Sequence, residues 1–118
     1  MTNRPRVKLN PAETAMCLAA LEYAHPLLGE VLISRGMQID VAKQAIDDAR
    51  ETTETLMTKL RYGKKCHINQ HQVAISMAAL EIAFKTLTNK GEDAPARIMA
   101  NDLITRMFDF LANQRGKV

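Results

Sequence analysis

Helix start and stop signals divide this chain of 118 residues into four segments, and no other feature constrains its fold as strongly. The first segment begins at Asn10, a capping residue that precedes Pro11 in the first helical turn, and Glu13 completes a capping box. Pro26 lies inside this segment and predicts a kink there. We expect four helices, with a glycine at or just beyond the end of each, within residues 10–36, 40–63, 69–89 and 93–116.

The apolar residues of the chain are mostly helix formers. Hydrophobic residues make up 47% of the sequence, but aromatic residues make up only 4% and tryptophan is absent. Ala, Leu and Met favour helices, whereas strand-rich domains rely more on aromatic and β-branched residues. Charged residues make up 25% of the sequence, which is the average for soluble proteins and not the composition of a disordered chain. The sequence therefore predicts a single all-α domain over residues 1–118.

An internal repeat predicts how the helices are arranged. Residues 9–28 and 68–87 lie 59 positions apart and match at eight of twenty positions, including the capping residues Asn10 and Asn69. We interpret this as two tandem, duplicated helical hairpins that pack into a four-helix bundle. The hairpins span residues 9–63 and 68–116.

The first and third helices carry more apolar surface than such a bundle needs. Their apolar side chains cover an arc of roughly 200°, about twice that of a peripheral helix, so we expect these two helices at the centre. Some apolar side chains then have no evident partner within the chain: Val31, Ile33, Ile98 and Phe108. Exposed apolar patches mark interfaces, and a second copy is the commonest partner, so these residues predict a homodimer.

Positive charge gathers at two places. The net charge is +3, and residues 60–118 hold nine Lys and Arg against five Asp and Glu. One cluster lies in an expected loop over residues 59–67: Lys59, Arg61, Tyr62, Lys64 and Lys65. The other is an expected flexible arm over residues 1–8, with Arg4, Arg6 and Lys8. Cations at the end of a helix also complement its dipole, but loops and arms of this kind contact phosphates.

Two patterns resemble parts of metal sites, and each is incomplete. Glu22-x-x-His25 has the spacing of a di-iron helix pair, but Phe84 stands where the repeat would need the second histidine. Cys66-His67-x-x-x-His71 supplies half of a zinc site, because zinc needs four ligands. We therefore expect no metal and no cofactor.

Nucleophilic catalysis has little support in the sequence. Cys66 follows Lys64 and Lys65, whose charges could lower its thiol pKa. No third group is placed to orient a Cys–His pair, and the five glycines are scattered rather than gathered in a phosphate-binding loop. We expect no catalytic residue, and a metal or thiol enzyme is the third possibility.

The expected location follows from three absences, and the expected function follows from the surplus apolar surface of the helices. The first residues lack the apolar core of a secretory signal, no apolar run reaches about 18 residues, and two cysteines are too few for a disulfide framework. We expect a small cytoplasmic, non-enzymatic adaptor that binds itself or another protein through helix faces and does not enter a membrane. The alternative is a nucleic-acid-binding or regulatory protein that uses the basic loop 59–67 and the N-terminal arm.

Overall fold

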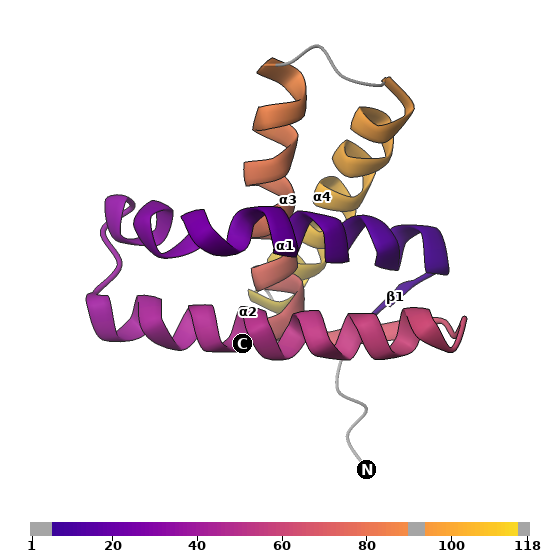
Figure 1. Ribbon diagram of the computed structural model, residues 1–118, viewed down its shortest axis with the longest axis horizontal. Coiled ribbons are helices and arrows are strands. Elements are labelled where there is room, and N and C mark those ends of the chain that lie inside the picture. The colour runs from indigo at the N-terminus through magenta and orange to yellow at the C-terminus, as the bar shows by residue number, and fades with distance from the viewer. Residues whose placement is uncertain (1–5, 90–93, 116–118) are drawn as a thin grey trace.

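A computed structural model describes residues 6–89 and 94–115 of the chain and shows an all-α bundle with one small antiparallel strand pair (Figure 1). The predicted fold class is confirmed, but the strand pair was not predicted. In chain order the elements are β1 (Arg6–Leu9), α1 (Pro11–Ser34), α2 (Ile39–Arg61), β2 (Cys66–Asn69), α3 (Gln70–Asn89) and α4 (Ala94–Arg115).

The start of α1 confirms the predicted capping box. The Asn10 side chain accepts a hydrogen bond from the Glu13 backbone N–H at 2.8 Å, and Glu13 accepts one from the Asn10 N–H at 3.0 Å. The helix continues to Ser34 without a break, so Pro26 does not interrupt it. A prolyl nitrogen has no hydrogen to donate, so one carbonyl in the preceding turn lacks its helical partner.

Both helices of the first hairpin end in the same motif. After α1, Gly36 has a φ of +92° and its N–H bonds to the carbonyl of Ile33, while the Met37 N–H bonds to that of Leu32. After α2, Gly63 adopts a φ of +64° and the same two bonds recur. These are Schellman motifs, in which a left-handed glycine satisfies the last carbonyls of a helix. The predicted stops at both glycines are confirmed.

The other predicted helix ends are close to those observed. α2 begins at Ile39, one residue before the predicted Asp40, and the side chain of its N-cap residue Gln38 makes no capping bond. α3 begins at Gln70, directly after the predicted cap Asn69. Asp93 and Gly116, the predicted limits of the fourth helix, lie outside the described residues.

The helices form two crossed layers. α1 and α2 lie side by side and antiparallel, and α3 and α4 cross them steeply from behind (Figure 1). Within the described chain α1 packs against both α2 and α3, but only slightly against α4. Small side chains are buried on the two central helices, which lets their backbones approach closely: Cys17, Ala20 and Ala24 on α1, and Ser76 and Ala79 on α3.

The strand pair corrects two predictions. Residues 6–8, expected within the flexible arm, belong to β1 and pair with β2, whereas residues 1–5 lie outside the described part of the chain. The expected loop 59–67 consists of the end of α2, a short link and the start of β2. Buried and exposed residues alternate in both strands, as the period of a strand requires. The strands were not predicted because an alternation over only four residues does not stand out beside long helical patterns.

Each half of the chain thus contains a short strand followed by two helices. The capping boxes that follow the strands, at Asn10 and Asn69, lie 59 positions apart, as the repeat does. The duplication of the halves nevertheless stays a prediction.

α1 has the length and composition of a membrane-spanning helix, with 24 residues and a mean hydropathy of 1.3 over its most apolar window. The buried core helix of a soluble protein passes the same test; here α1 packs against α2 and α3, and 28% of this window is buried. The absence of a membrane partner stays a prediction.

Candidate functional site

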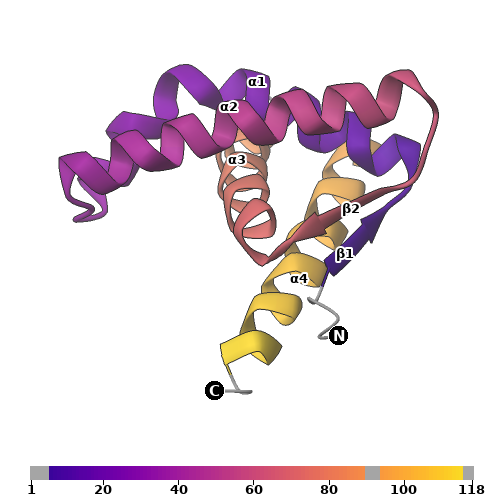
Figure 2. The same ribbon diagram turned by 90° about the horizontal axis from the view of Figure 1, so that it is seen from below.

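The two strands expose a polar face and bury an apolar one. Arg6, Lys8 and His67 are exposed, and Lys8 lies directly opposite His67 in the antiparallel register. The alternate residues, Val7, Leu9, Cys66 and Ile68, are buried in the core. Figure 2 shows the two strands side by side, below α2 and next to α4 in this view. This surface therefore consists of basic and imidazole side chains held on a fixed backbone.

Further basic residues adjoin one end of the strand pair. Lys64 and Lys65 are exposed in the link that leads directly into β2. Lys59 and Arg61 are exposed in the last turn of α2, and the charge of Lys59 acts on the Cys66 thiol, so this turn lies near the strand. We call the exposed residues Arg6, Lys8, Lys65 and His67 the basic ribbon face. Tyr62 is 69% exposed beside the link.

The structure thus brings together the two basic clusters that are separate in the sequence. Lys8, expected in a flexible arm, lies on the same strand pair as His67. The sequence signal for this arrangement was the alternation in Arg-Val-Lys-Leu and Cys-His-Ile-Asn, which has the period of a strand.

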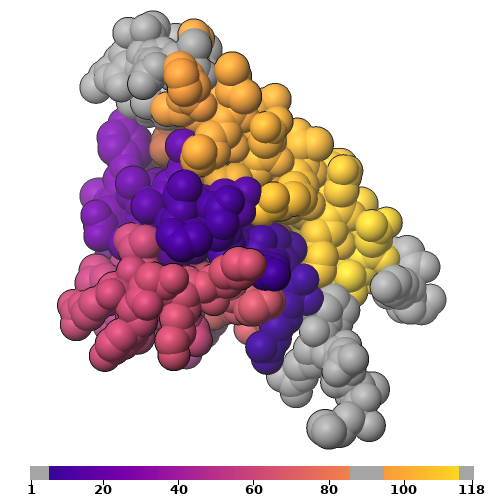
Figure 3. Space-filling view, turned by 90° about the vertical axis from the view of Figure 1, so that its right-hand side faces the viewer, coloured from indigo at the N-terminus to yellow at the C-terminus, as the bar shows by residue number. Residues whose placement is uncertain are grey.

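Arg106 of α4 anchors the ribbon to the helices. Its guanidinium donates a hydrogen bond to the carbonyl of Lys8 at 3.3 Å and forms an ion pair with Glu13 at 2.9 Å. Burial by itself would raise the pKa of the Glu13 carboxyl. The hydrogen bonds from Arg106 and from the Asn10 backbone N–H, together with the positive charge of Arg106, have the larger combined effect, so the pKa is lowered. Figure 3 shows the start of α1 between α4 and the end of α2.

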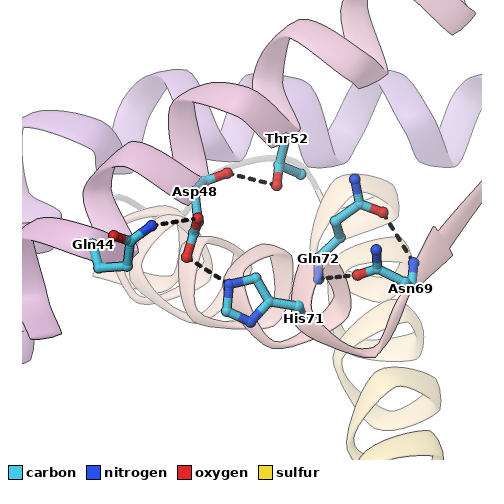
Figure 4. Close-up of polar contacts among 6 residues, drawn as sticks. All are labelled: Gln44, Asp48, Thr52, Asn69, His71 and Gln72. Carbon is cyan, nitrogen blue, oxygen red and sulfur yellow. Dashed lines mark hydrogen bonds and ion pairs between the residues drawn. The ribbon is translucent and has the colours of Figure 1, made fainter.

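His71 does not belong to the basic ribbon face. Its Nε2 lies 2.5 Å from a carboxylate oxygen of Asp48 on α2, and Gln44 donates to the other oxygen at 3.1 Å (Figure 4). The hydrogen bond from His71 lowers the pKa of Asp48. Asn69 and Gln72 form the capping box of α3 beside this pair. The Asp48–His71 pair therefore joins the two hairpins, and both carboxylate oxygens are already bonded.

The possibility that Lys64 and Lys65 lower the thiol pKa of Cys66 is contradicted by the structure. Cys66 lies on the buried side of β2, and its neighbour His67 points to the opposite side because side chains alternate along a strand. Burial raises the thiol pKa of Cys66 and raises that of Cys17 to about 12. Both thiols are therefore protonated at neutral pH.

The two partial metal patterns stay incomplete within the described residues. Glu22 is exposed on α1, while His25 is partly buried near Arg50 and Thr53 of α2. Across residues 6–89 and 94–115, no three His, Cys, Asp or Glu side chains are grouped as a metal site needs.

The predicted interface residues differ in exposure, and the two on α4 lie far apart. Ile98 and Phe108 are 62% and 61% exposed on α4, but ten helical residues place them about 15 Å apart along the axis. Ile33 is exposed at the end of α1, whereas Val31 is partly buried. Ile98 and Phe108 therefore do not form one continuous apolar patch on α4.

Comparison with protein-family models, with curated proteins and with solved structures finds no match. The function of the chain must therefore be inferred from its own residues.

Proposed function

We propose that this protein binds duplex DNA through its basic ribbon face. One observation supports the proposal: an exposed two-stranded ribbon presents Lys8 and His67 side by side, with Arg6 exposed on the same strand as Lys8 and Lys65 exposed just before β2. The major groove of B-form DNA is about 12 Å wide and admits a two-stranded ribbon. The major groove of A-form RNA is too deep and narrow for side chains to read, so DNA is the expected duplex.

The chemistry of the face suits a groove lined with acceptors. Arginine and lysine donate hydrogen bonds to O6 and N7 of guanine, and a histidine ring adds a donor or an acceptor. Asn69, the remaining exposed polar residue of β2, already holds the capping box of α3 through its carbonyl oxygen. Base contacts therefore fall to Arg6, Lys8 and His67.

The adjoining cations suit the phosphate backbone. Lys59, Arg61, Lys64 and Lys65 are all exposed near one end of the ribbon. Contacts with phosphates position a protein on DNA and supply a binding term that depends on salt. The net charge of +3 favours the encounter.

The proposal is tested by measuring binding to a fluorescent DNA duplex at several salt concentrations. In the double variant Lys64→Glu and Lys65→Glu we expect the affinity to fall by at least about tenfold. The slope of log affinity against log salt should also decrease by about two, because each phosphate contact contributes about 0.9.

A matched control separates local contact from net charge. Lys43→Glu with Lys85→Glu makes the same change in charge on exposed residues of α2 and α3 outside the ribbon. At 0.15 M salt the Debye length is about 8 Å, so this control should bind nearly as well as the original chain. Equal losses in both double variants, or binding that salt does not change, would contradict the proposal.

A second candidate is a cytoplasmic, non-enzymatic protein that associates with another copy of itself. The large exposed side chains of Ile98 and Phe108 favour it, since burying such side chains stabilises an interface. The two functions are compatible, because the basic ribbon face and these residues lie on different elements.

A further inference from the structure

We propose that a single chain reads an asymmetric DNA site, in which the two halves of the site differ in sequence. The proposal rests on the proposed function. It follows from the geometry of the ribbon, in which a two-fold rotation places each residue of one strand at the position of a residue of the other. The side chains at these equivalent positions differ.

An antiparallel strand pair has a local two-fold axis perpendicular to its face. In the observed register Lys8 pairs with His67, so the axis through this pair exchanges these two residues. The same rotation exchanges Val7 with Cys66, and Arg6 with Lys65, which precedes β2. A ribbon built from two identical chains would carry the same side chain at both members of each pair. Here both members come from one chain and differ.

The differences change what each half can recognise. The lysine ammonium has three donors and no acceptor, so Lys8 favours acceptor atoms such as O6 and N7 of guanine. A neutral imidazole has one donor and one acceptor, so His67 can also accept from an amino group of adenine or cytosine. Arg6 presents a planar fork of donors to a base, whereas Lys65, at the equivalent place, presents a point charge that suits a phosphate. The two half-sites should therefore have different preferred bases.

One chain is sufficient to build this surface. Each strand leads directly into a helix of the same chain, α1 after β1 and α3 after β2. The contact of Arg106 with Lys8 and Glu13 holds β1 against α1 and α4. No second copy is needed to complete the ribbon, so we expect one chain for each bound site.

The test is selection of bound duplexes from a library of random DNA, followed by affinity measurements on the selected sequences. We expect the full chain to select an asymmetric consensus. It should bind that duplex about tenfold more tightly than a symmetric duplex made by repeating either half, because one well-matched base contact has about that effect. A titration above the dissociation constant, made with Phe108→Glu so that self-association of the chain does not enter the count, should saturate at one chain per duplex.

The decisive variant is His67→Lys, which places lysine at both members of the central pair. His67 is exposed, so the substitution should leave the fold intact, and circular dichroism checks this. We expect the central bases of its consensus to become two-fold symmetric. His71→Lys is the matched control, because it makes the same change four residues away, where the side chain faces Asp48. It should retain the asymmetric consensus.

The outcomes separate this inference from the proposed function. A symmetric consensus for the original chain, two chains per duplex, or an unchanged consensus in His67→Lys would overturn the inference alone. No enrichment of any duplex, with no salt-dependent binding, would overturn the proposed function and this inference with it.

Discussion

Single side chains join the ribbon to the helices, and Glu13 is the clearest example. Its carboxylate accepts from the Asn10 backbone at 3.0 Å and from Arg106 at 2.9 Å, and Arg106 in turn donates to the carbonyl of Lys8. One carboxylate therefore connects the end of β1, the first turn of α1 and the middle of α4. Protonation of the Glu13 carboxylate should therefore weaken the attachment of the ribbon to the helices.

The pKa of Glu13 is lowered in the folded chain, which fixes the sign of its pH dependence. When the pKa of a carboxyl is lower in the folded chain than in the unfolded chain, the carboxylate stabilises the fold at pH values above the pKa of the unfolded chain. This stabilisation is lost as the pH falls through the pKa of the folded chain. We expect the free energy of unfolding to decrease between about pH 5 and pH 3. In Glu13→Gln this decrease should be smaller, as measured by urea denaturation at each pH.

The control for this prediction is Glu30→Gln, which removes an exposed carboxylate from the same helix. It should leave the pH dependence nearly unchanged. An identical pH dependence in Glu13→Gln and the original chain would show that the Arg106 contact does not stabilise the fold.

At the scale of elements, the link between α2 and β2 positions the basic residues. Gly63 closes α2 in a left-handed conformation, and the N–H of Lys64 bonds to the carbonyl of Lys59 at 3.1 Å. The chain therefore turns sharply after the helix and enters β2 at Cys66, directly after Lys64 and Lys65. This turn places Lys64 and Lys65 at the end of the ribbon.

We expect Gly63→Ala to lower the free energy of unfolding by about 1 kcal/mol, because a Cβ atom disfavours the left-handed conformation. No heavy atom outside the adjoining residues lies within 4 Å of such a Cβ atom, so the effect is one of backbone conformation rather than collision. Gly63→Asn should have a smaller effect, since asparagine tolerates this conformation better. Equal stability of Gly63→Ala and the original chain in urea denaturation would contradict the prediction.

At the scale of the whole molecule, the two crossed layers leave apolar side chains of α4 exposed. Phe108 is 61% exposed, although its neighbour Met107 is fully buried. The exposed face of α4 is therefore the place where a second copy would dock if the chain forms a homodimer.

We expect the original chain to be a dimer by light scattering and Phe108→Glu to be a monomer at the same concentration, because a charge in an apolar interface is unfavourable. Its DNA affinity should be little changed, since both strands of the ribbon belong to one chain. A monomeric original chain at high concentration would remove the homodimer hypothesis and leave the DNA proposal standing.

Much of the helical architecture could be predicted from local chemistry. Asn10 and Asn69 mark helix starts because their side chains satisfy free backbone N–H groups, and Gly36 and Gly63 mark ends because they adopt positive φ. The small strands could not be predicted in this way, because four residues give too short an alternation and the pairing joins residues about 60 positions apart. The basic surface was missed as a unit for the same reason.

The sequence by itself determined the four helices, the caps at Asn10 and Asn69, the glycine stops at Gly36 and Gly63 and the basic character of two separate segments, because each depends on neighbouring residues. Only the tertiary structure decided that Lys8 faces His67, that Cys66 is buried and inert, and that Val31 is partly covered. These outcomes depend on how distant segments bury their apolar residues together. Burial of Val7, Leu9, Cys66 and Ile68 turns the alternate residues outward, and packing of the core thereby creates the basic ribbon face.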